Sequence, residues 1–304
     1  MKKRILCGAA AIVSLFILFM IVWPLGGLLM PQRTSFGANW GGFLQAEEDS
    51  CDVMFFGSSI VYCDAYPDFF TQTSGRSAYV LAGPEQNMAM TYYYIKGALE
   101  TQSPSIVFVE MTEMYFPKKN DFQKANIGYM PWGENRLRAT FDTAEKDEWF
   151  GLLFPIYDYH DRWNEITPDE LKQNLEGYTA EKCRGYTYLT DAVPQGKFTV
   201  KKVTEDEYDF NLEWFKKITQ LARENDITLI PYIAPYYERL SDEHMEQIRK
   251  DVADEGFYLL NCNEYFDEFG FNSQTDFFDS LHTNCYGAQK FSRWMGRYVK
   301  DNVM

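Results

Sequence analysis

Short apolar runs alternate with longer amphipathic runs along most of this chain after residue 50. Near-continuous apolar runs of strand length occur at 51–59, 77–83, 105–112, 227–235 and 257–264. Apolar residues recur at three- and four-residue steps, as they do in amphipathic helices, over 86–102, 208–226, 241–256 and 286–301. Buried strands separated by helices indicate a parallel sheet that is covered on both faces. We therefore expect a three-layer α/β/α domain over 51–304.

Residues 113–206 interrupt this alternation. They contain short helical patterns and turns rich in Trp and Tyr, but no clear apolar pattern typical of strands. A structureless loop of this length is improbable in a compact domain, so we expect a helical insertion that forms a cap.

The N-terminus carries a different pattern. Lys2, Lys3 and Arg4 precede an uncharged apolar stretch at 5–30. This stretch exceeds the ~7–15 apolar residues of a cleaved signal peptide and suits the ~30 Å hydrocarbon layer of a membrane. We expect an uncleaved signal anchor at 1–30 and a juxtamembrane segment at 31–50. Because positive residues stay in the cytoplasm, we expect a single-pass protein of the cell membrane whose chain from about residue 31 onward is extracytoplasmic.

Charge and composition limit the classes of molecule that the protein is expected to bind. The chain carries a net charge of −15, which argues against nucleic acid, because phosphate neutralisation needs positive charge. Aromatic residues make up 17% of the chain and suit either a well-filled core or surfaces on which sugars stack.

The cysteines do not suggest a metal site. Six are present without a C-x-x-C spacing, and five of them follow the apolar N-terminus. We expect no structural metal, no cofactor and no full disulfide framework, although one bond, such as Cys51 with Cys63, is compatible with the sequence.

Two serines at the end of the first predicted strand raise a question of chemistry. In "VMFFGSSIVYCDAYPDFF" (53–70), Ser58 and Ser59 follow Gly57 at the point where the strand gives way to a helix. They are either small residues of a tight turn or include a nucleophile at the carboxyl edge of the sheet, where sites form in such folds.

A hydroxyl nucleophile needs a base, and the chain has only three histidines. His244 lies in a predicted surface helix. His282 follows the last predicted strand, with Asp279 three residues earlier, a spacing that lets the carboxylate reach one ring nitrogen while the other faces outward. The alternative is a helix start with an incidental histidine, capped by Thr283 or Asn284.

Together, "FFGSSI" (55–60), "LAGPEQN" (81–87) and "DSLHTN" (279–284) resemble the SGNH/GDSL hydrolase superfamily. The resemblance implies a flavodoxin-like α/β/α fold in which Ser59 is the nucleophile, Asp279 and His282 complete a triad, and Ser58 is a spacer. It follows the order of elements through nearly the whole domain, although the motifs cover few residues.

Within that superfamily the chain looks most like the membrane-anchored branch that includes the D-alanyl transfer protein of teichoic acid modification and the alginate acetylation proteins. "YHDRW" (159–163) resembles a stretch of this branch, so His160 is either a pocket residue or a structural one.

The chain departs from the superfamily in two blocks. Glu85 stands where the second block has glycine, so the oxyanion role implied for that block passes to a backbone N–H between Gly83 and Gln86 and to the side chain of Gln86 or Asn87. In the third block "VEMTEM" (109–114) lacks the usual asparagine, and Thr112 takes roughly its place.

The resemblance implies an O-acyltransferase that modifies a cell-wall or secreted polysaccharide through an acyl ester on Ser59. Its expected partners are a glycan or wall-polymer acceptor, a multi-pass membrane O-acyltransferase as donor, and the membrane through residues 5–30. Two alternatives remain open: a membrane-tethered carbohydrate esterase, and a catalytically silent assembly subunit.

Overall fold

The computed structural model describes residues 2–31, 39–176, 183–192, 203–236 and 240–303. Parts of the expected juxtamembrane segment (32–38) and of the expected insertion (177–182 and 193–202) lie outside the described residues.

The core of the molecule is a five-stranded, all-parallel sheet in the order β2-β1-β3-β4-β5, which is the flavodoxin-like order. The strands are β1 (Val53–Gly57), β2 (Ala78–Ala82), β3 (Ile106–Glu110), β4 (Thr228–Ile233) and β5 (Leu260–Asn261). The three-layer α/β/α prediction is confirmed, and each strand falls inside a predicted apolar run. The last strand is much shorter than its predicted run.

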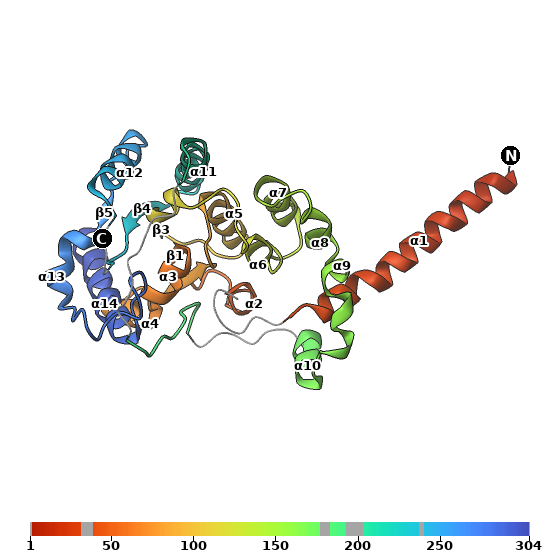
Figure 1. Cartoon of the computed structure of the whole chain (residues 1–304), viewed down its shortest axis with the longest axis horizontal. Helices are drawn as coiled ribbons and strands as arrows, with labels where there is room; N and C mark the ends of the chain where they lie inside the picture. Colours follow the sequence, from red (N-terminus) through yellow and green to blue (C-terminus); the bar gives the residue numbers. More distant parts are fainter. Residues whose placement is uncertain (1, 32–38, 177–182, 193–202, 237–239, 304) are drawn as a thin grey trace.

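The helices of the described residues form the outer layers and the insertion (Figure 1). Before β3 they are α1 (Lys2–Leu29), α2 (Asn39–Phe43), α3 (Ser59–Asp64), α4 (Pro67–Ser74) and α5 (Met88–Ala98). Between β3 and β4 they are η1 (Met111–Tyr115), α6 (Gln123–Ile127), α7 (Glu134–Thr143), α8 (Trp149–Leu153), α9 (Pro155–Tyr159), η2 (His160–Asn164), α10 (Pro168–Glu176) and α11 (Glu205–Glu224). After β4 they are α12 (Asp242–Asp254), η3 (Cys262–Tyr265), α13 (Phe266–Phe269) and α14 (Cys285–Asn302).

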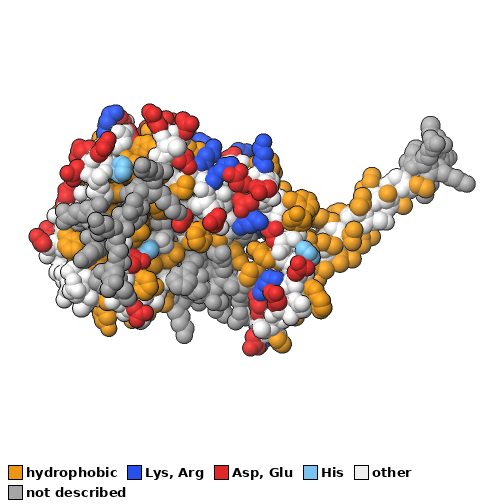
Figure 2. Space-filling model, viewed as in Figure 1, with side chains coloured by type: hydrophobic (Ala, Val, Ile, Leu, Met, Phe, Trp, Pro, Cys, Tyr) orange, Lys and Arg blue, Asp and Glu red, His pale blue; other side chains and the backbone are white. Residues whose placement is uncertain are grey.

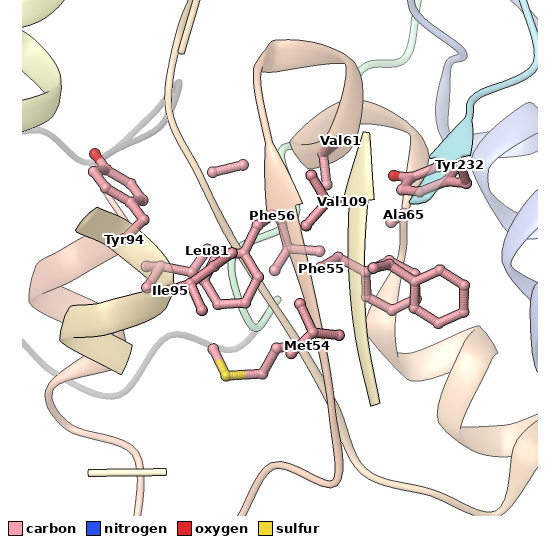
Figure 3. Packing of buried hydrophobic residues seen from close by; sticks show 14 of the residues in the cluster. Met54, Phe55, Phe56, Val61, Ala65, Leu81, Tyr94, Ile95, Val109 and Tyr232 are labelled. Carbon is pink, nitrogen blue, oxygen red and sulfur yellow. The ribbon is translucent and has the colours of Figure 1, made fainter. Parts of the chain in front are cut away.

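Side chains alternate across the sheet and fill both of its faces, as period-two strand geometry requires. On β1, Phe56 points towards Ile95 of α5, whereas Phe55 points to the opposite face (Figure 3). There Phe55 stacks on Phe108 at 4.6 Å and meets Phe70 of α4 edge-on. Helices α5 and α11 therefore cover one face, and α3, α4 and α14 pack together on the other.

The expected insertion has two parts. Its helices α6 to α10 lead away from the sheet towards α1 (Figure 1), and no strand occurs in its described residues. The stretch 183–192 lies on the body instead: Val80 donates its backbone N–H to Arg184, and Thr187 donates to Tyr62.

Two further features bear on the expectations from sequence. Residues Cys7–Leu29 form a helix long and apolar enough to cross a membrane, and it projects from the body (Figure 1). All six cysteines are free, so Cys51 and Cys63, which are both buried, do not form the bond that the sequence allowed.

Candidate active site

The turn between β1 and α3 separates the two adjacent serines. Gly57 has a φ of +151°, and an added Cβ there would lie 2.6 Å from Oε1 of Glu113. Only glycine fits this backbone and this close approach. Ser58 is fully buried at the start of α3, while Ser59, the first residue of the helix, is partly exposed.

The other two predicted triad residues lie beside Ser59. His282 Nε2 is 2.9 Å from Ser59 Oγ, and His282 Nδ1 is 2.9 Å from Asp279 Oδ2. Residues 223 positions apart in the chain thus form one hydrogen-bonded series of hydroxyl, imidazole and carboxylate. The imidazole is 18% exposed and the carboxylate 37%, so the series is open to solvent on one side.

Asp279 is organised by its own loop. Its Oδ1 accepts the backbone N–H groups of Leu281 and His282, each at 2.8 Å. Burial alone would raise the pKa of Asp279, but the His282 imidazole and these two N–H groups outweigh it and lower the pKa below its usual value. The carboxylate is therefore charged at neutral pH and holds the imidazole beside it in one orientation.

Asp64, which the sequence did not single out, fixes the histidine loop to α3. Its Oδ1 accepts the backbone N–H of Thr283 at 2.8 Å and the Thr283 hydroxyl at 2.9 Å. Burial raises the pKa of this carboxyl well above its usual value, although both bonds from Thr283 oppose the shift. Because α3 begins with Ser59 and Thr283 follows His282, Asp64 connects the two halves of the triad. Its place five residues after Ser59 carries no recognisable sequence signal.

Replacing Asp64 with alanine should displace the histidine loop, because the buried N–H of Thr283 would lose its acceptor. We expect the rate of p-nitrophenyl acetate hydrolysis to fall by about tenfold or more, since small displacements of a hydrogen-bonded base are costly. Asp64→Asn keeps an acceptor oxygen and should stay within about threefold of the wild type. The rate of p-nitrophenyl acetate hydrolysis by both variants tests this prediction, and equal losses in the two would contradict it.

The residues of the third block form a buried hydrogen-bond network around Glu110 and do not supply an oxyanion donor. Glu110 accepts hydrogen bonds from the backbone N–H and hydroxyl of Thr112, from the Tyr236 hydroxyl and from the backbone N–H of Ala234. Thr112 is fully buried, and its hydroxyl also contacts that of Tyr236. In this structure Thr112 therefore supports the edge of the sheet and does not take over the role of the missing asparagine.

Glu110 should make stability depend on pH. Burial raises its pKa to about 7, although bonds from Tyr236, Thr112 and Ala234 lower it. Between its unfolded pKa near ~4.3 and this folded value, the folded state holds one more proton, so stability falls as pH rises, by on the order of 3 kcal/mol in total. Melting temperatures between pH 5 and 8 should show this fall in the wild type and a smaller one in Glu110→Gln. Identical profiles would contradict the prediction.

A second buried series runs behind the turn at Gly57. Gln86 Nε2 donates to the Thr91 hydroxyl at 2.8 Å, and Thr91 donates to Glu113 at 2.7 Å. Burial raises the pKa of Glu113 well above its usual value, and the neighbouring Glu110 adds to this. The series links the second and third blocks beneath the nucleophile.

The three residues expected to stabilise the oxyanion differ in whether an N–H group remains available as a donor. The backbone N–H of Gly83 donates to Gly57, and both side-chain N–H groups of Asn87 are directed to the carbonyls of Pro117 and Lys118. The Asn87 side chain also caps α5. Gln86 uses one of its two side-chain N–H groups on Thr91, and the other has no acceptor among the residues that the structure describes.

His160 does not lie with the triad. It begins η2, is 62% exposed at its side chain, and contacts Tyr157 and Asp161. This 3-10 helix packs against α1, so of the two interpretations that the sequence left open for His160, the structural one fits this structure. His244 packs its ring against Tyr115 at 4.1 Å and is likewise outside the triad. Among the described residues, no group of three His, Cys, Asp or Glu side chains could hold a metal ion.

Comparison with known proteins gives similarity to solved structures only, since no protein-family profile and no curated protein matches the chain. A GDSL-like lipase from Bacteroides thetaiotaomicron is similar over 82% of this chain and 87% of its own, with 12% identity and a TM-score of 0.38. An acetyl xylan esterase is similar over 83% of this chain and 99% of its own, with 11% identity and a TM-score of 0.39. Similarity at this level carries no argument about the chemistry, which we infer from the geometry of the site.

Proposed function

We propose that this protein is a membrane-tethered, extracytoplasmic, serine-dependent O-acyltransferase that modifies a cell-wall or secreted polysaccharide. The observation that carries the proposal is the hydrogen-bonded series of Ser59, His282 and Asp279 at the carboxyl edge of the sheet. A serine hydroxyl in contact with an imidazole that is oriented by a carboxylate is the arrangement that activates a hydroxyl for acyl transfer.

The reaction proceeds in two balanced steps. Ser59 Oγ attacks the carbonyl carbon of an acyl donor, His282 Nε2 takes the serine proton, and the bond from the acyl carbon to the donor oxygen breaks as that oxygen receives the proton. His282 then takes a proton from an acceptor hydroxyl, whose oxygen attacks the carbonyl carbon of the acyl-Ser59 ester. The bond from that carbon to Ser59 Oγ breaks as His282 returns the proton to Oγ, which leaves the acylated acceptor and free Ser59. Asp279 keeps the imidazole oriented and stabilises its cation.

The oxyanion of each tetrahedral intermediate needs donors that the fold does not already use. The backbone N–H of Ser59 has no described acceptor, because it belongs to the first turn of α3. One side-chain N–H of Gln86 has no acceptor in the described part of the chain. Gln86 is fully buried. For Gln86 to act as the second donor, the acyl group has to enter the site deeply enough to reach its side chain.

Two observations favour transfer over hydrolysis. The stretch 183–192 of the insertion contacts α3, which begins with Ser59, and the first residue of α14, three residues after His282: Thr187 donates to Tyr62, and Leu189 accepts from Cys285. An element braced in this way can limit the access of water to an acyl-enzyme. The apolar α1 would also hold the site close to a membrane-bound acyl donor, such as a multi-pass acyltransferase.

The test compares water with a sugar hydroxyl as acceptor. Full-length protein in detergent is given p-nitrophenyl acetate with and without a wall-type oligosaccharide. Transfer predicts acetylated oligosaccharide and faster release of nitrophenol when the acceptor is present. Fast hydrolysis that ignores the acceptor would instead identify an esterase. No turnover and no acyl-enzyme would identify a silent assembly subunit.

A further inference from the structure

The C-terminal part of α1 is packed into the insertion. It lies along α9 and also contacts η2 and α10. At Gly26 the two backbones approach so closely that an added Cβ would lie 2.6 Å from the backbone nitrogen of Ile156. The apolar helix and the insertion therefore form one packed unit.

Among the described residues, the polar contacts between this helix and the insertion lie at the very end of the helix. Arg162 donates to the carbonyl of Leu29 at 2.6 Å and pairs with Glu170 at 2.7 Å. Asn174 donates to the carbonyl of Leu28 at 2.7 Å. These side chains satisfy carbonyl groups that have no partner within a helix end.

Contacts one to three turns back along α1 are apolar. Trp23 lies 4.3 Å from Trp132 and 5.9 Å from Phe154, and Phe19 lies 6.4 Å from Phe154, measured between ring centres. A cleft of about 210 Å³ opens between α1 and α9, and Leu15 and Ile156 are among its lining residues. Polar contacts at the end and apolar contacts further in match the order of headgroups and hydrocarbon in a leaflet.

The length of α1 sets the depth of these contacts. A helix rises ~1.5 Å per residue and the hydrocarbon layer is ~30 Å thick. Phe19 is ten residues before Leu29, hence about 15 Å below it and near the middle of the candidate span Cys7–Leu29. If α1 crosses a membrane, Phe154, which packs on Phe19 and Trp23, must lie inside the hydrocarbon of the leaflet nearer the domain.

Large apolar side chains beside Phe154, and one on the following η2, are exposed. Phe150, Tyr157 and Trp163 are 54%, 58% and 72% exposed, and the Phe150 ring lies within 5.0 Å of those of Phe154 and Tyr157. Hydrophobic side chains cover α1 and continue onto the part of the body from which it emerges (Figure 2). Exposed apolar surface that is continuous in this way marks an interaction site, and Trp and Tyr favour the membrane interface.

We propose that Phe150, Phe154, Tyr157 and Trp163 form a membrane-embedded foot whose partner is the lipid of the leaflet from which the domain emerges. The proposal rests on the membrane-spanning role proposed for α1, and it adds that the domain is seated on the bilayer in one orientation. A seated domain presents Ser59 at a fixed height to an acyl donor in the membrane. The order of polar and apolar contacts along α1 favours lipid over a protein partner.

Photo-crosslinking in vesicles tests the foot. A diazirine-bearing phenylalanine analogue replaces Phe150 or Tyr157 in the full chain, which is reconstituted into vesicles of phosphatidylcholine and phosphatidylglycerol. Two matched positions serve as controls: Phe16 of α1, which is 62% exposed, and Tyr258 before β5, which is 61% exposed. Hydrolysis of p-nitrophenyl acetate by each labelled protein reports that it is folded, independently of lipid contact.

We expect lipid adducts at Phe150 and Tyr157 at yields within about threefold of Phe16 and at least about tenfold above Tyr258. Lipid adducts at Phe16 but not at Phe150 or Tyr157 would overturn the foot and leave the anchor standing. Absence of lipid adducts at Phe16 would overturn the spanning role of α1 and the foot with it. In native membranes, adducts of Phe150 and Tyr157 with a second protein in place of lipid would also overturn the proposal.

Discussion

Replacing Ser59 with alanine should abolish acyl transfer almost completely while leaving the fold intact. The substitution removes the atom that forms the ester, and in other enzymes with this arrangement such losses reach about a thousandfold to a millionfold. Ser59 is partly exposed at the start of α3, so its hydroxyl contributes little to packing. Initial rates with p-nitrophenyl acetate and the melting temperature of the same preparation measure the two effects separately.

The neighbouring serine provides a matched control. Ser58 is fully buried, and its hydroxyl has no hydrogen-bond partner among the described residues. Ser58→Ala removes only a buried polar atom that is not satisfied, so activity and stability should stay close to those of the wild type. If Ser58→Ala lost as much activity as Ser59→Ala, the assignment of the nucleophile would be wrong.

Substituting Gly57 by alanine should be the most damaging change to stability in the site. The new Cβ would lie 2.5 Å from Val61 and 2.6 Å from Glu113, at a backbone angle that side chains rarely adopt. Strain and overpacking together predict a loss of about 3 kcal/mol or more. That corresponds to a fall of about 6–12 °C in melting temperature for a domain of this size.

A comparison with Gly75→Ala separates the contribution of backbone strain from that of overpacking. Gly75 also has a positive φ, of +76°, but no atom lies near the position of an added Cβ. Gly75→Ala should therefore cost only about 1 kcal/mol, from backbone strain alone. Thermal unfolding of both variants tests the difference, and equal losses would show that close packing behind the nucleophile is unimportant.

Much of the fold was predictable from pattern, because a parallel sheet covered on both faces requires continuous apolar runs such as that at β1. The pairing of His282 with Asp279 was also predictable, since a three-residue spacing on one loop brings the two side chains together. Their contact with Ser59 could be expected only from topology, which returns both segments to the same edge of the sheet.

The remainder of the site depends on tertiary contacts without a local signal. Asp64 and Glu113 are ordinary acidic residues in the sequence, and only the fold buries them behind the nucleophile. The role of His160 stayed open in the sequence because a short motif says nothing about direction, and the insertion carries η2 to α1 and away from the triad. Gly83 and Asn87 were given donor roles, but their N–H groups are used within the fold.

The central claim is that Ser59 is an activated nucleophile. The most direct measurement is labelling of the full-length protein with a fluorophosphonate, followed by mass spectrometry of the peptide that contains both serines. This account predicts one adduct, on Ser59, that is absent from Ser59→Ala and strongly reduced in His282→Gln, because the reagent reacts with a serine only when a base takes its proton. An unlabelled protein, or an adduct that persists without His282, would contradict it.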